Sequence, residues 1–390
     1  MFGLDKGVVR FRLVMSLVIF LLLGVWRSAT SAEAIQQVPE KTSKTWHLAY
    51  YEGGDNSSYR RYLISTIERL MELGWVEPAE IPHLNNSKQL WYWLANNTKS
   101  NYIKFVEGNY YSAQWDQNLR EKEKQKIIRR LTQENDIDLI FAMGTWAGED
   151  LANNTHHTPT FVISASNPIE SGIIKSADNS GYDHVFARVA PQRYEQQVRL
   201  FHDLVKFKKL GVAYENTKNG RTYAALNSIT KVAKERQFEI ISCYTQSDIS
   251  ERAIANTSVI TCIDRLAKEV DALYITEQGG VNEQSIPDIV DIANKRQVAT
   301  LSQEGGDAVK YGILMSVSSP DFDSVGLFLA KALDDVFKGA APGNLNQLFK
   351  EQNSISINLK TAEIIGAYIY ADWLAIADRI YRQIEQPETK

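Results

Sequence analysis

The sequence predicts an α/β protein of two similar halves, each a parallel sheet flanked by helices. Short apolar runs alternate with amphipathic segments along most of the chain, which is the pattern of βαβ units. A Gly/Ser/Asn-rich passage after Pro168 interrupts this alternation, and a second series then begins. Open parallel sheets bind small ligands at the carboxyl ends of their strands, so we expect a binding site at such an edge.

The first 32 residues have the pattern of a signal peptide. Three basic residues precede an apolar run over 13–25, and the small residues Thr30 to Ala32 offer a cleavage site. The run is short for a membrane span. Arg27, between the run and the cleavage site, favours the alternative of an uncleaved membrane anchor.

Charge and length narrow the class of protein further. Removing residues 1–32 leaves 39 basic and 46 acidic residues, a net charge of −7. A mildly acidic chain is poorly suited to nucleic acid, which requires a basic face. The remaining chain of about 358 residues is long enough for two domains.

The first half is predicted to begin with a strand, 46–51, and a helix that Ser57 or Ser58 caps and Gly74 ends. Its later elements are a short helix, 88–95; a strand, 102–106; a helix, 117–134; a strand, 137–142; a helix that opens at Gly144 and Thr145; and a strand, 160–164.

The second half is predicted to contain five strands, at 184–189, 210–214, 238–244, 272–276 and 299–302. Helices are predicted at 191–206, at 221–236 and at 284–296, and a further helix before the 272–276 strand is predicted to end near Val270. A segment at 311–317, a helix at 320–338 and a late strand at 354–359 follow. A last helix is predicted to carry Ile364, Ile365, Tyr368, Trp373 and Ile376.

Several motifs in order carry a family resemblance. They are GTWAGEDLANNT, PTFVISASNP and IESGIIKS, then VAPQRYEQQVRLFHDLV with KKLGVAYE, then VDALYIT and QVATLSQEGGDAVKYGILMSV. With the opening strand and helix, this set covers about 45–75 and 102–365. It resembles the extracytoplasmic substrate-binding proteins of bacterial ABC importers, and more narrowly the family with tryptophan- and other aromatic-amino-acid-binding members.

The resemblance implies a two-lobed periplasmic-binding-protein fold, type I-like, with one small molecule in the cleft between the lobes. It assigns 45–170 with about 303–340 to the first lobe and about 185–302 to the second. Residues 341–390, with the late strand and the C-terminal helix, are not assigned to either lobe. Closure of the lobes on the ligand is expected to present a surface to a membrane permease.

An amino acid is a zwitterion, so its site needs donors for the carboxylate and acceptors for the ammonium. The candidate residues follow strands at the expected cleft. The donors are Gly144, Thr145, Ser164, Ala165 and Ser166; the ammonium partners are Glu52, Glu277 and Glu304, with Glu215 a further candidate; Asn216 and Tyr214 complete the predicted site. For each glutamate the alternative is a solvated loop carboxylate.

Two features depart from the family pattern. The loop Glu277-Gln278-Gly279-Gly280 replaces a turn of shorter side chains, which leaves the ligand identity open. Residues 77–101 form a longer connection, and with the loop from Gly108 to Trp115 they add aromatic residues: Trp91, Tyr92, Trp93, Tyr110, Tyr111 and Trp115. These rings either pack an inserted helix or form a wall over the cleft.

Motifs of enzymes and cofactors are not found in the sequence: it has no GxSxG, GxxxxGK[ST] or HExxH. We therefore predict no enzyme activity, no cofactor and no metal. His156 and His157 stand together but without a third ligand at metal spacing. Cys243 and Cys262 could form a disulfide if the protein is exported to an oxidising compartment. The alternative is that they are two small, buried apolar side chains.

The predicted function is extracytoplasmic solute binding for an ABC importer, with an amino acid or similar zwitterion as the leading ligand. The expected partners are that small molecule and an inner-membrane ABC permease, and the expected location is the periplasm. We expect a monomer that does not bind nucleic acid. The alternative is a ligand-sensing periplasmic receptor coupled to a membrane sensor kinase.

Overall fold

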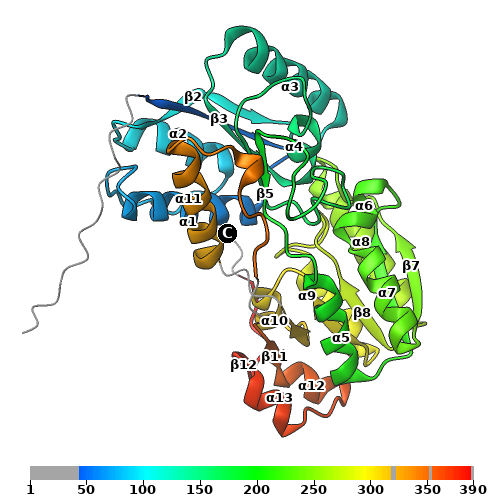
Figure 1. Cartoon of the computed structure of the whole chain (residues 1–390). Helices are drawn as coiled ribbons and strands as arrows, with labels where there is room; N and C mark the ends of the chain where they lie inside the picture. The colour runs from blue at the N-terminus through cyan, green and yellow to red at the C-terminus, as the bar shows by residue number, and fades with distance from the viewer. Residues whose placement is uncertain (1–43, 318–321, 351–353, 388–390) are drawn as a thin grey trace, which may run out of the picture. The chain divides into compact units, whose positions relative to one another are not determined.

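A computed structural model describes residues 44–317, 322–350 and 354–387, and these form two sheets flanked by helices (Figure 1). The predicted α/β class, with parallel-dominated sheets, is confirmed. The predicted signal peptide, 1–32, lies outside the described residues. Within the described ranges, no helix combines the length and the apolar character that a membrane span requires.

The first sheet has five strands in the order β2-β1-β3-β4-β5, and all its pairs are parallel. The strands are β1 (Trp46–Glu52), β2 (Ile103–Ser112), β3 (Leu139–Met143), β4 (Thr160–Ile163) and β5 (Val185–Ala187). Consecutive residues of β1 face opposite sides, so Leu48 and Tyr50 enter one core while Ala49 and Tyr51 enter the other.

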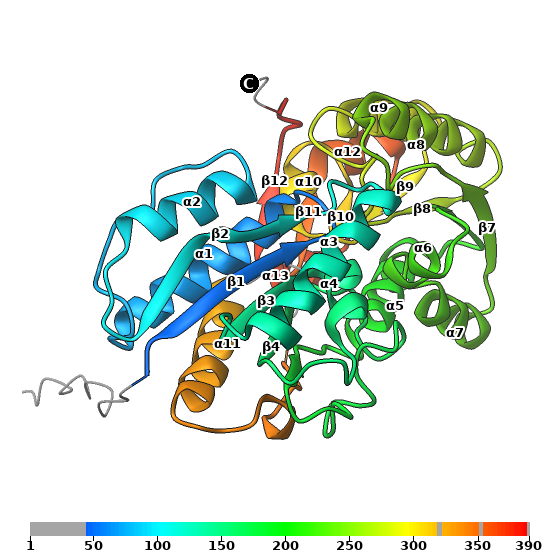
Figure 2. The same cartoon turned by 90° about the horizontal axis from the view of Figure 1, so that it is seen from above.

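Helices cover both faces of this sheet (Figure 2). The first core packs under α1 (Ser57–Glu72), α2 (Ser87–Asn97) and α11 (Phe322–Phe337), and α1 and α11 lie side by side. The opposite core includes α3 (Gln117–Arg129) and α4 (Gly144–Leu151). Asn56 caps α1 by accepting from the Ser58 amide, one or two residues before the predicted caps.

The second sheet has seven strands in the order β12-β11-β10-β9-β8-β6-β7, with only the β10–β11 pair antiparallel. The strands are β6 (Lys209–Tyr214), β7 (Glu239–Tyr244), β8 (Ala272–Ile275), β9 (Ala299–Ser302), β10 (Met315–Ser316), β11 (Ser356–Asn358) and β12 (Arg379–Tyr381). One core includes α5 (Arg193–Val205), α7 (Leu226–Arg236) and α12 (Leu359–Ile365), and the other includes α8 (Arg252–Leu266) and α9 (Ile286–Lys295).

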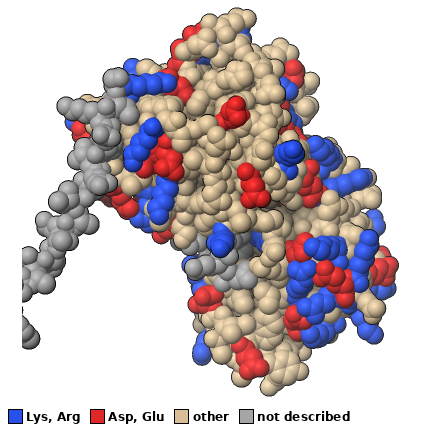
Figure 3. Space-filling model, in the orientation of Figure 1, with Lys and Arg blue, Asp and Glu red and all other residues tan. Residues whose placement is uncertain are grey.

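Charges of both signs are interspersed over α5 and α7 (Figure 3). They form ion pairs between the two helices, such as Arg199 with Glu235 at 2.9 Å and Lys231 with Glu195 at 2.9 Å. Pairs this exposed contribute little to stability, so the apolar core beneath them holds the helices in place.

Backbone breaks account for several differences from the predicted elements. The helix predicted at 221–236 is two helices, α6 (Lys218–Tyr223) and α7, because Ala225 has a φ of +53°. The predicted last helix ends at Gly366, whose φ is +71°, and a separate helix, α13 (Ala371–Ile376), follows.

Other differences lie in the strands and short helices. The second strand is longer than predicted and runs to Ser112, so most of the predicted loop from Gly108 to Trp115 is strand. The end of the predicted 117–134 helix is a π-helical turn, Arg130–Glu134. The helix α10 (Gly306–Lys310) and the strand β12 were not predicted, because both are too short to show a periodic pattern.

The chain crosses between the two sheets beside the site described below. After β5 the backbone of Val189 pairs with Leu348 of a returning segment. The segment 303–340, which the resemblance assigned to the first lobe, is divided between the two sheets. α10 and β10 lie with the second sheet, whereas α11 packs on α1 of the first. β11 and β12 place the chain after 355 in the second sheet.

A disulfide joins Cys243 of β7 to Cys262 of α8, so the alternative of two free buried thiols is wrong. The sulfurs cross-link an edge strand to the helix that covers it, across 19 residues.

We expect a Cys243→Ala/Cys262→Ala variant to lose about 3 kcal/mol of unfolding free energy, since the bridge restricts the unfolded chain. Urea unfolding of the oxidised protein and this variant measures the loss, and an unchanged midpoint would contradict it.

Candidate ligand-binding site

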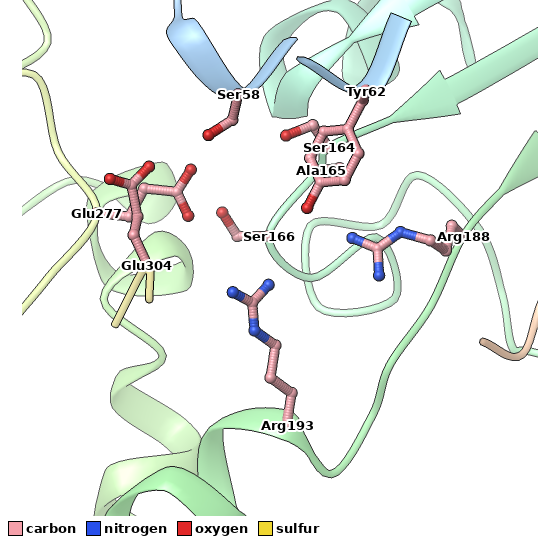
Figure 4. Close-up of a pocket in the computed structure, with 9 residues that line it drawn as sticks. All are labelled: Ser58, Tyr62, Ser164, Ala165, Ser166, Arg188, Arg193, Glu277 and Glu304. Carbon is pink, nitrogen blue, oxygen red and sulfur yellow. The ribbon is translucent and has the colours of Figure 1, made fainter. Parts of the chain in front are cut away.

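A pocket opens between loops of the two sheets (Figure 4). Its empty volume is about 330 Å³, which includes the part that opens to solvent. The residues that line it are polar except for one alanine: Ser58, Tyr62, Ser164, Ala165, Ser166, Arg188, Arg193, Glu277 and Glu304. Such a set favours a ligand with charged groups rather than a purely apolar one.

Two glutamates form one side of the pocket. Glu277 comes just after β8 and Glu304 just after β9, and these neighbouring parallel strands bring the two carboxyl groups together. Figure 4 shows both carboxyl groups on the same side of the pocket. Burial raises the pKa of both carboxyl groups, and the charge of Glu277 raises the pKa of Glu304 further.

A buried hydrogen-bond network holds these glutamate loops. The Glu277 amide donates to Gln303 Oε1 at 2.8 Å. Gln303 directly precedes Glu304, so this bond links the two glutamate loops. Gln197 Nε2 donates to the Gln303 carbonyl at 3.1 Å, and Tyr274 in turn donates its hydroxyl to Gln197 at 2.7 Å. These fully buried partners fix the backbone of the two loops that carry Glu277 and Glu304.

Two arginines supply positive charge. Arg188 lies on the crossing segment after β5, is only 7% exposed, and places its guanidinium 5.6 Å from the ring centroid of Tyr62. Arg193 is the first residue of α5 and lies 5.3 Å from the ring centroid of Tyr194. In Figure 4 the carboxyl groups and Arg188 lie on opposite sides, and Arg193 reaches between them.

The serine loop after β4 supplies hydrogen-bonding groups. Ser164 has a φ of +64°, a left-handed conformation that costs free energy in a residue other than glycine. Tyr194 donates its hydroxyl to the Ser166 carbonyl at 3.2 Å, which ties this loop to α5. Ser58 and Tyr62 lie one turn apart on α1 and complete the lining from the first sheet.

The structure brings five of the ten predicted site residues together in this pocket: Ser164, Ala165, Ser166, Glu277 and Glu304. Glu52 lies elsewhere, because its buried carboxylate accepts from Tyr50, Tyr110 and Ser112 at 2.7–3.0 Å. These bonds make Glu52 an internal link of the first sheet, outside the lining of this pocket.

The other predicted residues also contact the protein itself. The Tyr59 hydroxyl covers Gly144, because a Cβ atom added at this glycine would stand 1.9 Å from that hydroxyl. Thr145, the next residue of α4, is not among the residues that line the pocket. Tyr214 is 3% exposed within the second core. Asn216 is exposed and accepts from Arg221. Glu215 accepts from the amides of Ser247 and Asp248, so it fixes a loop.

Four lining residues were not predicted: Ser58, Tyr62, Arg188 and Arg193. Arg188 directly follows β5, but the predicted strand 184–189 extended past it, so a search of strand ends did not select it. Arg193 opens a helix after a crossing segment, and its place depends on tertiary structure. Ser58 was predicted only as a helix cap.

The histidine pair gains a third neighbour, since the His184 ring lies 4.9 Å from His156 and 5.7 Å from His157. Burial, and then the charge of His184, lowers the pKa of His156 to about 4. Across the described residues, no three His, Cys, Asp or Glu side chains are arranged to hold a metal ion. We therefore interpret these rings as packing.

Comparison with known proteins places this pocket in context. A curated relative, the tyrosine-binding protein of Clostridioides difficile, is 24% identical over 230 residues, which are 58% of this chain and 63% of that protein. A solved Streptococcus pneumoniae ABC domain in complex with L-Trp has a TM-score of 0.66 and 17% identity, covering 86% of this chain and all of that one. A conserved domain protein from Vibrio cholerae matches equally well by these measures. Residues 98–380 match the family described as ABC transporter substrate binding protein, and the chain belongs to that family.

Proposed function

We propose that this protein binds an α-amino acid in the pocket without converting it chemically. The observation that carries the proposal is the placement of charge: the Glu277–Glu304 pair lies on one side of the space, Arg188 lies on the other, and the Arg193 guanidinium reaches between them. An α-amino acid has a carboxylate and an ammonium on one carbon, so it can meet both at once.

An aromatic amino acid is the leading ligand. The tyrosine-binding relative and the L-Trp complex support this class. Tyr62 adds an aromatic surface to the lining, although its ring also contacts Arg188. The loop after β8, with its longer Glu277 and Gln278 side chains, is the part in which ligand preference would differ from that of relatives.

Delivery to an ABC permease from outside the cytoplasm is the proposed role. Membership of the family supports it. The disulfide between Cys243 and Cys262 fits an oxidising compartment such as the periplasm. We propose two lobes built on the two sheets, the first with α11 and the second with α10 and the chain after 355, acting as a monomer.

Hinge closure on the ligand is supported by hydrogen bonds between the two halves, here called the rim contacts. Lys218 donates to the Ser171 carbonyl at 3.0 Å, and Asn219 donates to Glu149 at 3.1 Å. Asn227 also donates to Glu170 at 2.6 Å. Each bond joins a loop or helix of the first sheet to α6 or α7 of the second, so the bonds would break on opening.

Removing rim contacts is expected to speed ligand release. A Lys218→Ala/Asn219→Ala variant should bind about twofold to tenfold more weakly, because exposed polar pairs contribute about 1 kcal/mol or less each. The loss should lie in the dissociation rate, which stopped-flow tryptophan fluorescence measures. Lys231→Ala, which removes an ion pair within the second half, is the control. Equal dissociation rates in the variant and wild type would count against closure through these contacts.

A ligand panel tests the proposed function. Protein stripped of bound solute by unfolding and refolding is heated with L-tyrosine, L-tryptophan, L-phenylalanine, aliphatic amino acids, sugars and dicarboxylates. We expect only amino acids to raise the unfolding temperature, and aromatic ones most; a ligand at about 100 times its Kd adds about 2.7 kcal/mol. Stabilisation by sugars or dicarboxylates alone would overturn the assignment.

Sensing by a membrane receptor partner is the second candidate. The segment from α12 to β12 exposes Tyr368 by 73%, Tyr370 by 60% and Ile376 by 56%, and Figure 3 shows few charges there. An exposed apolar patch is typical of a protein contact. Deletion of the gene separates the roles: lost uptake of labelled amino acid supports import, whereas intact uptake with a lost transcriptional response supports sensing.

A further inference from the structure

We propose that the pocket exchanges a proton for its ligand: the ammonium group of the amino acid replaces one proton held between Glu277 and Glu304. The inference rests on the proposed function, since it needs a ligand with an ammonium group. Ligand affinity would then depend on pH, which the charge of the pocket alone does not require.

The placement of the pair favours a shared proton. Glu277 and Glu304 follow the neighbouring strands β8 and β9, and their carboxyl groups line one side of the same pocket. Ionised carboxylates only accept hydrogen bonds, so two carboxyl groups this close can bond each other only with a proton between them. Gln303, which directly precedes Glu304, accepts from the Glu277 amide at 2.8 Å, so the two loops are held together. Two negative charges this close in a buried site are unfavourable unless a cation is present.

The surrounding charges decide which cation that is. Arg193 from α5 and Arg188 from the crossing segment favour ionisation of Glu277, and Arg193 does so for Glu304. Asp307 of α10 opposes ionisation of Glu304. Tyr59 of α1 lies near both glutamates and Asp248, and burial raises its pKa well above the ordinary value, so its hydroxyl stays neutral.

The two arginines are therefore not sufficient to ionise the pair fully, because burial still raises the pKa of both carboxyl groups and the charge of Glu277 raises the pKa of Glu304 further. A ligand ammonium beside the pair adds a positive charge at close range. The remaining carboxyl O–H bond then breaks, its proton passes to solvent, and the pair carries two negative charges. The free protein holds one more proton than the complex, so affinity must rise with pH until the free pair is ionised.

Calorimetry of the full mature chain tests the exchange. L-tyrosine and L-tryptophan are titrated at the same pH in phosphate and in Tris, whose heats of ionisation differ. We expect the observed enthalpies to differ by the release of nearly one proton per ligand at low pH. The dissociation constant should fall about tenfold per pH unit over the range in which the free pair holds its proton, and then become constant.

The Glu304→Gln variant separates this inference from the proposed function. The glutamine amide can donate to an ionised Glu277, so the pair no longer needs a shared proton. The variant should bind at least about tenfold more weakly at high pH and show nearly equal enthalpies in both buffers. Glu121→Gln, an exposed residue of α3, is the control and should behave as wild type.

The outcomes differ for the two claims. Tight binding by the wild type with equal enthalpies in both buffers overturns the proton exchange and leaves amino-acid binding intact. An absence of binding overturns both. A measurement without ligand is also available: in protein labelled with ¹³C at glutamate Cδ, the resonance lost in Glu304→Gln should titrate well above the ordinary pKa, and an ordinary titration would contradict the inference.

Discussion

Replacing Arg193 by glutamine should weaken amino-acid binding by about 30-fold or more. Its guanidinium reaches into the pocket between the glutamate pair and Arg188, where a ligand carboxylate would lie. Removing one partner of a buried charge pair costs about 2 kcal/mol or more, which corresponds to this factor. Isothermal titration with L-tyrosine or L-tryptophan measures the change.

The same helix supplies the control for this variant. Arg199 of α5 pairs with Glu195 and Glu235 at the surface, away from the pocket lining. Arg199→Gln should leave affinity unchanged. Thermal unfolding without ligand checks that Arg193→Gln is folded. If both variants bind as tightly as wild type, Arg193 is not the carboxylate partner.

Replacing Trp91 by alanine should destabilise the first half by about 3–5 kcal/mol, the usual cost of removing a buried aromatic ring. The ring is fully buried between Tyr50 and Phe105, with centroids 5.6 and 5.5 Å away, and its Nε1 donates to the Val106 carbonyl at 2.9 Å. Urea unfolding measures the loss.

This variant also distinguishes the two interpretations of the inserted aromatic segment. Packing predicts lost stability with ligand affinity retained below the transition, whereas a wall over the cleft predicts the reverse. Trp93→Ala is the matched control, since Trp93 is only partly buried against the same core and should cost less. A Trp91→Ala protein that is as stable as wild type but does not bind ligand would contradict the packing interpretation.

The fold could be predicted from the sequence because most of its strands are buried on both faces. Runs such as 139–143 and 272–275 are apolar throughout, and helical periodicity separates them. Breaks within helices were harder to predict. Ala225 takes a left-handed conformation that alanine does not predict. Gly366 is a residue type that often ends a helix, but the apolar and aromatic residues at helical spacing around it favoured one continuous helix.

The pocket could be predicted only in part, for a physical reason. Ser164 to Ser166, Glu277 and Glu304 follow strands, and parallel strands bring their carboxyl ends to one edge whatever the details of packing. The same rule selected Glu52, yet Tyr110 reaches it only because β2 runs longer than its apolar pattern. Arg193 depends on how the crossing segment enters α5, which local sequence does not determine.

The most direct test of the account compares L-tyrosine with two analogues in one calorimetric titration. Tyramine lacks the carboxylate that Arg188 and Arg193 are proposed to bind, and 3-(4-hydroxyphenyl)propionate lacks the ammonium that Glu277 and Glu304 are proposed to bind. We expect L-tyrosine to bind and each analogue to bind at least about 30-fold more weakly, since each leaves charged groups of the pocket without their partner. Equal affinity for L-tyrosine and either analogue would contradict recognition of a zwitterion at this site.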